Sequence, residues 1–169
     1  MNRIRTNHHQ AMKRSKNFLM IFFVLFLVSC HQKEIFFSYQ SVPKSGWNKD
    51  SLLTFNFQVA DTVPKYDVFI QVRHYGNYPY QNLWLFLENN NVDKNIIKKD
   101  TIEFFLADEF GKWLGSGTGA IKEMPVYYRQ QIHFPDSGRY QIKIGQGMRD
   151  SLLVGIEKVG IRIEKVVGK

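Results

Sequence analysis

Cysteine is nearly absent from this sequence, because Cys30 is the only one among 169 residues. A single thiol excludes an internal disulfide framework and the paired cysteines of zinc and redox motifs. Acidic side chains are missing from the first 29 residues, and the rest of the chain carries 18 basic and 15 acidic ones. This near balance does not predict binding to nucleic acid. A long hydrophobic run is also missing, since the apolar stretch from Phe18 to Val28 is shorter than the roughly 20 residues of a transmembrane helix.

The position of the one cysteine indicates lipidation. Basic residues between 13 and 16 precede the apolar stretch 18–28, which is the order found in a secretory signal peptide. The stretch ends in Leu27-Val28-Ser29-Cys30, which matches the lipobox of bacterial lipoproteins: an aliphatic residue, a tolerant position, a small residue and cysteine. We therefore predict a lipoprotein signal peptide at 1–29, with Met12 as an alternative start.

Processing at this site would place the protein on a membrane. Cys30 would carry lipid, including a fatty acyl chain of the palmitate class, and residues 30–34 would form a short tether. His31 stands where an aspartate would favour retention in the inner membrane, so we expect an outer-membrane anchor, on the periplasmic face or at the cell surface. The alternative is an ordinary reduced cysteine near the end of a membrane-anchor helix.

The chain after the tether shows the period-two pattern of half-buried strands. In the segment 53–59, apolar residues alternate with threonine, asparagine and glutamine. The segment 83–87 is apolar on both faces, which is typical of a central strand. With short turns between the strands, we predict one all-β domain over 35–169, an antiparallel β-sandwich of jelly-roll or immunoglobulin-like type with about eight strands. The predicted strands are 35–40, 53–59, 67–73, 83–88, 101–106, 127–134, 139–144 and 160–165.

The residue patterns contain no convincing catalytic or metal-binding constellation. The glycine cluster 115–119 lacks the Gly-Lys-Ser/Thr ending of a phosphate-binding loop, so it favours a bulge or a close strand crossing. The adjacent Asp108 and Glu109 favour a turn, because neighbouring strand residues point to opposite faces. We expect His133 on the exposed face of a strand. The sequence therefore predicts a protein that is not an enzyme and that needs no metal or cofactor.

Aromatic side chains are the one feature that suggests binding. Several lie beside polar turn residues, where exposed rings can stack on sugars or contact a protein. The alternative is that they fill the core and the ends of the sandwich. The sequence also raises the chance of a cis bond before Pro79. The candidates for contact with a ligand or partner are Trp47, Tyr78, Tyr80, Trp84 and Trp113.

The whole chain resembles the GldH family of gliding-motility lipoproteins from Bacteroidetes. The resemblance is carried by the lipobox and by the segments GWNKDSLLTF (46–55), NYPYQNLWLFLE (77–88), FLADEFGKWLGSGTGAIKE (105–123), FPDSGRYQIKIGQGMRD (134–150) and GIEKVGIRIEK (155–165).

The resemblance implies an outer-membrane lipoprotein of the gliding apparatus, working beside the type IX secretion machinery. It implies lipidation at Cys30 and no catalytic residue. The expected partners are the membrane and other gliding or secretion proteins of the envelope. A different class of function stays open, in which the sandwich is a module that binds carbohydrate or peptidoglycan.

Overall fold

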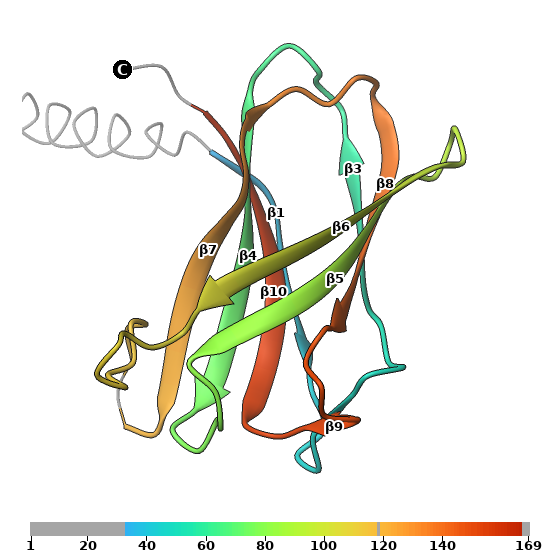
Figure 1. Ribbon diagram of the computed structural model, residues 1–169. Coiled ribbons are helices and arrows are strands. Elements are labelled where there is room, and N and C mark those ends of the chain that lie inside the picture. Colours follow the sequence, from blue (N-terminus) through green and yellow to red (C-terminus); the bar gives the residue numbers. More distant parts are fainter. Residues whose placement is uncertain (1–32, 118, 167–169) are drawn as a thin grey trace, which may run out of the picture. The chain divides into compact units, whose positions relative to one another are not determined.

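Ten antiparallel strands make up the computed structural model, which describes residues 33–117 and 119–166 (Figure 1). Nowhere in those ranges does a helix occur that is long and apolar enough to span a membrane. The strands are β1 (Glu34–Ser41), β2 (Trp47–Asn48), β3 (Leu53–Val59), β4 (Tyr66–Tyr75), β5 (Asn82–Asn91), β6 (Ile96–Phe105), β7 (Ile121–Ile132), β8 (Gly138–Gln146), β9 (Leu152–Leu153) and β10 (Ile156–Lys165).

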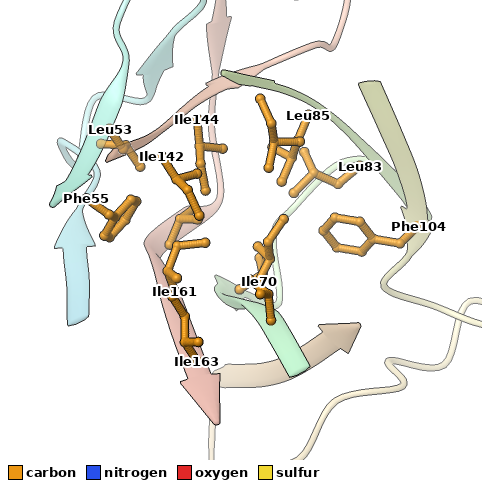
Figure 2. Close-up of a cluster of buried hydrophobic side chains, with 14 of the residues drawn as sticks. Leu53, Phe55, Ile70, Leu83, Leu85, Phe104, Ile142, Ile144, Ile161 and Ile163 are labelled. Carbon is orange, nitrogen blue, oxygen red and sulfur yellow. The ribbon is translucent and has the colours of Figure 1, made fainter. Parts of the chain in front are cut away.

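Eight of the strands form two four-stranded sheets. The first has the order β1-β10-β4-β7 and the second the order β3-β8-β5-β6. One side chain in two points into the space between the sheets, where leucine, isoleucine and phenylalanine form a continuous core (Figure 2). In β3, Leu53, Phe55, Phe57 and Val59 are buried, whereas the residues between them are partly or fully exposed. The predicted all-β antiparallel sandwich is confirmed.

The two strands beyond the predicted eight are short. β2 and β9 contain two residues each, and they pair Trp47 with Leu153 and Asn48 with Leu152. The indole Nε1 of Trp47 donates a hydrogen bond to the carbonyl of Ser51 at 3.0 Å. This ribbon therefore holds a buried tryptophan at the end of the core.

Strand β5 is an interior strand of its sheet, between β8 and β6, as predicted for the segment 83–87. Leu83, Leu85 and Leu87 point into the core and are fully buried. Trp84 and Phe86 point to the outer face, where Trp84 is 38% exposed and Phe86 is 53% exposed. The apolar outer face of β5 is thus not covered by the described part of the chain.

The hairpin of β5 and β6 extends beyond the core. A strand that faces a core on one side exposes every second residue, but the first four residues of β6 are all exposed. Figure 1 shows the tip of this hairpin projecting from the rest of the sandwich.

Several predictions fall on residues 1–32, which lie outside the described residues. The signal peptide 1–29 and acylation of Cys30 therefore stay predictions. Glu34, the last residue of the predicted tether, is the first residue of β1. The bond before Pro79 is trans, as are all peptide bonds in the described ranges.

Candidate functional site

The five aromatic residues singled out from the sequence do not form one surface. Trp47 and Tyr78 lie in the core, where a ligand cannot reach them without a rearrangement. Tyr80 and Trp113 are half-buried and pack against the core. Of the five residues, Trp84 alone is exposed, at 38%. The structure thus separates these residues into four that pack at one end of the sandwich and one that faces outward.

Three of the buried or half-buried rings gather around His74 at that end. The ring centres of His74 and Trp113 are 4.5 Å apart, and those of His74 and Tyr78 are 6.0 Å apart. Tyr80 packs edge-on against Tyr78 and donates a hydrogen bond to the Asp150 carboxylate at 2.7 Å. These contacts hold the loop that contains Trp113 against strand β4, so the rings stabilise the fold.

His74 is fully buried in this cluster, and its environment favours the neutral form. Its Nδ1 lies 3.0 Å from the carbonyl of Tyr75, whereas Nε2 has no hydrogen-bond partner among the described residues. Burial lowers the pKa of His74, and the positive charge of Lys122 lowers it further, although the hydrogen bond to Tyr75 acts in the opposite direction. Protonation would place an unpaired charge beside Trp113.

We expect the stability of the protein to fall in mild acid because of His74. The pKa of His74 is lower in the folded state, so the unfolded chain binds the proton more readily. The free energy of unfolding therefore keeps its full value above the pKa of an unfolded histidine, about 6.5. Below that pH it falls by at most about 1.4 kcal/mol per pH unit. Urea unfolding followed by tryptophan fluorescence measures this slope. His74→Phe should flatten it, and an unchanged slope in this variant would contradict the assignment.

An exposed apolar patch lies on the outer face of the second sheet. We call it the Trp84 patch, and it consists of Leu52, Trp84, Phe86, Gly145 and Gly147. Phe86 stands opposite Gly145 in the register of β5 and β8, and the amide of Gly147 donates to the carbonyl of Trp84 at 2.7 Å. A Cβ atom on Gly147 would lie 3.2–3.3 Å from the side chains of Trp84 and Phe86. Glycine at this position therefore allows the two aromatic side chains to pack closely against the backbone.

The Trp84 patch contains residues that sequence reasoning missed. Phe86 and Leu52, both about half exposed, were not candidates. The sequence held part of the signal, because 83–87 is apolar on both faces and a strand with a core on one face must turn every second residue outward. Gly145 in β8 and Gly147 just after it mark where the backbone approaches Leu52 and the aromatic side chains closely.

A second aromatic face occurs on the outside of the first sheet. Phe69 and Tyr127 pack with ring centres 4.3 Å apart, and the guanidinium of Arg162 lies over the Phe69 ring at 4.3 Å. Phe37 and Tyr127 are about half exposed at its borders. Phe37 on β1 and Tyr127 on β7 lie at opposite edges of this sheet, so its exposed rings are not neighbours, unlike Trp84 and Phe86.

A cavity of about 460 Å³ opens between the sheets beside β6 and β7. Its floor is mainly apolar, and the Asn89 amide donates to the Tyr128 hydroxyl at 2.6 Å within it. An ion pair between Arg129 and Asp100, 2.5 Å apart, joins the two strand edges. Tyr128 and Arg129 of the wall are thus already paired, whereas the buried Oδ1 of Asn90 has no hydrogen-bond partner among the described residues.

The other sequence candidates have structural roles. Asp108 accepts hydrogen bonds from the amides of Phe110 and Lys112, both at 2.9 Å, which confirms a turn. Ser116 pairs with Glu123, and a Cβ atom on Gly115 would lie 2.6 Å from the Glu123 carbonyl, which confirms a close strand approach. Among the described residues, no group of three histidine, cysteine or acidic side chains is placed to hold a metal ion.

Comparison with known proteins gives the family. Residues 34–163 match the family described as GldH lipoprotein. The gliding motility lipoprotein GldH homolog of Christiangramia forsetii is 37% identical over 155 residues, which cover 88% of this chain and 94% of the relative. The gliding motility lipoprotein GldH of Flavobacterium johnsoniae is 36% identical over 154 residues, with 87% and 94% covered.

Among solved structures, an exo-β-1,3-galactanase from Phanerochaete chrysosporium aligns with a TM-score of 0.37 and 13% identity, over 73% of this chain and 26% of that one. A likeness this low carries no functional conclusion. The match that covers most of the sandwich and the two relatives that span nearly their full lengths agree with each other. The chain belongs to the GldH lipoprotein family.

Proposed function

We propose that this protein is a gliding-motility lipoprotein of the cell envelope. The observation that carries the proposal is the family match over residues 34–163, together with two relatives named as gliding motility lipoproteins or their homologue. In finer detail, we propose an outer-membrane protein that has no enzymatic activity and that contacts gliding or type IX secretion components.

Attachment through Cys30 is supported by the sequence that surrounds it. The lipobox ends four residues before β1 begins at Glu34. A lipid on Cys30 would hold the sandwich close to the membrane, since so few residues separate the two. The domain would then act as a scaffold at the surface of the bilayer.

The Trp84 patch is the surface best suited to a protein partner. Soluble domains seldom leave neighbouring large apolar side chains open, and such patches commonly mark interaction sites. Trp84 and Phe86 are adjacent on one face of β5, and Leu52 lies against Gly145 of β8 beside them. Aromatic residues of this kind supply most of the binding energy in many interfaces.

We expect the double substitution Trp84→Ala and Phe86→Ala to reduce recovery of partner proteins by about ten-fold or more, because it removes both rings of the patch. The measurement is a crosslinked pull-down of the tagged chain from native membranes, quantified by mass spectrometry. A matched control, Phe37→Ala with Tyr127→Ala, removes two half-exposed rings from the other sheet. Equal recovery by both double variants would exclude the Trp84 patch as the contact.

A carbohydrate-binding module is the second candidate, and the exposure of Trp84 and Phe86 favours it, because open rings can stack on sugar faces. The burial of Trp47 and Tyr78 counts against the larger aromatic surface predicted from the sequence. Recovery of glycan without protein partners in the same pull-down would favour this candidate over the scaffold.

A further inference from the structure

The tip of the β5–β6 hairpin exposes apolar side chains where no core requires them. Ile96 is 48% exposed and Ile97 is 54% exposed, although they are neighbours on one strand and point to opposite faces. Val92, on the other side of the turn, is also exposed. Exposure on both faces of the ribbon means that the described part of the chain leaves this apolar tip uncovered.

The tip has a fixed conformation. Asp93 accepts hydrogen bonds from the backbone amide and the Nε of Arg139, at 2.8 and 2.9 Å. Lys94 forms an ion pair with Asp136 at 2.7 Å, and the amide of Val92 donates to the carbonyl of Arg139. These contacts tie the hairpin turn to the turn between β7 and β8, so its exposed side chains are held in place before any partner binds.

The tip lies at the end of the sandwich where the described chain begins. Asn91 pairs with Tyr140 near the start of β8, and Val59 at the end of β3 pairs with Gly138 in the same region. The turn after Val59 leads into β4, where Tyr66 stands opposite Lys165. The backbone carbonyl of Lys33 accepts a hydrogen bond from the amide of Lys165 at 2.7 Å.

A fourth exposed apolar residue belongs to this same end. Val63 lies in the turn between β3 and β4 and is 83% exposed. Lysines accompany the apolar side chains of the hairpin: Lys99 pairs with Glu88 yet keeps most of its side chain exposed, and Lys98 has no ion-pair partner in the described ranges. Apolar tips flanked by lysine match the two parts of a bilayer surface, its acyl boundary and its anionic headgroups.

Chain length limits how far this end can be from a lipid on Cys30. Three peptide units separate Cys30 from Lys33. A fully extended chain spans at most about 3.6 Å per residue, so Lys33 would lie within about 11 Å of the anchored cysteine. A sandwich held so closely must face the membrane with the end that contains Lys33.

We propose that the tip of the β5–β6 hairpin and the β3–β4 turn rest on the leaflet that holds the Cys30 anchor. Ile96, Ile97 and Val63 enter the boundary between headgroups and acyl chains, and Lys98 and Lys99 contact anionic headgroups. The occupant of this apolar tip is therefore a lipid surface. The inference rests on acylation of Cys30, which belongs to the proposed function. It adds a fixed orientation, with the Trp84 patch on the side of the domain, free for a partner.

A depth measurement on the mature lipoprotein tests this orientation. Acylation consumes Cys30, so a cysteine introduced at Ile97 or Val63 is the one free thiol and can carry a nitrobenzoxadiazole label. The variants Ile97→Cys and Val63→Cys are compared with Leu152→Cys, which replaces a leucine of similar exposure, 45%, in β9. Each is reconstituted into vesicles of phosphatidylethanolamine and phosphatidylglycerol that contain doxyl-labelled lipid as quencher.

We expect quenching at positions 97 and 63 to be at least about three-fold larger than at position 152, because interfacial side chains enter the acyl boundary. Quenching at Ile97→Cys no greater than at Leu152→Cys would overturn the inference. A blue-shifted label at position 97 without lipid quenching would also overturn it, since a second copy of the chain would then cover the tip.

Failure of the underlying proposal has a different signature. If the mass of the purified mature chain shows no acyl group and the chain does not float with vesicles, lipidation at Cys30 is wrong and both proposals fall. An acylated, vesicle-bound chain with an unquenched position 97 removes only the proposed orientation.

Discussion

A Cys30→Ala chain is expected to lose its acyl groups, its place in the membrane fraction and its support of gliding. The thiol is the attachment point of the predicted lipid, and alanine offers no atom that can replace it. Each buried methylene contributes about 0.8 kcal/mol, so two or more acyl chains give lasting attachment where a single chain gives only marginal binding. Labelled palmitate incorporation, membrane fractionation and colony spreading measure the three losses.

The neighbouring substitution His31→Ala is the control for this experiment. It leaves the lipobox intact, so incorporation of palmitate and membrane attachment should stay at the level of the unaltered chain. If the Cys30→Ala chain still incorporated palmitate, the attachment site would lie elsewhere. If it lost palmitate but still supported gliding, membrane anchoring would be separable from the proposed role.

Trp47→Ala is expected to lower the free energy of unfolding by about 3–5 kcal/mol, the range for removing a large aromatic side chain from a core. Trp47 is 1% exposed, faces Leu153 across the β2–β9 ribbon, and donates its indole hydrogen bond to Ser51. A loss of this size is a large part of the stability of an ordinary domain, which is about 5–15 kcal/mol. Urea unfolding followed by the fluorescence of the remaining tryptophans measures it.

Trp84→Ala provides a matched comparison, because it removes the same side chain from the surface of the second sheet. Substitutions at exposed positions rarely cost much, and we expect a change of less than about 1 kcal/mol. The two substitutions would thus impair different properties: Trp47→Ala would lower stability, and Trp84→Ala would lower the recovery of partner proteins. Equal destabilisation by the two substitutions would contradict the burial difference on which this comparison rests.

The sequence predicted the strands well wherever a strand was long enough to show alternation. All eight predicted segments correspond to strands of the two large sheets. β2 and β9 were missed because two residues cannot display a period. Their pairing depends on the contact of Trp47 with residues about a hundred positions later, which local sequence does not encode.

The candidate site was harder to predict because aromatic residues occur both in protein cores and on binding surfaces. Near turns there is no periodicity to indicate which side of the chain faces the core, so Trp47 and Tyr78 could not be distinguished from exposed rings. In β5 both faces are apolar, so the period indicated only that either the leucines or Trp84 and Phe86 would be exposed. The exposed tip at Ile96 and Ile97 follows from how far the hairpin extends past the opposite sheet, and that distance is a property of tertiary structure.

The pairing of β1 with β10 has a mechanical consequence for a protein that is pulled by its anchor. β1 is an edge strand, and its residues from Glu34 to Ser41 pair with β10 residues from Glu164 to Lys158 in antiparallel register. Hydrogen bonds between antiparallel strands are perpendicular to the strand axis. A force drawing the anchor away along β1 therefore loads these bonds in shear, so they share the strain and do not open one at a time. A pull on the lipid proposed at Cys30 would thus enter the sandwich through β1 in shear, the direction in which the paired strand resists separation best.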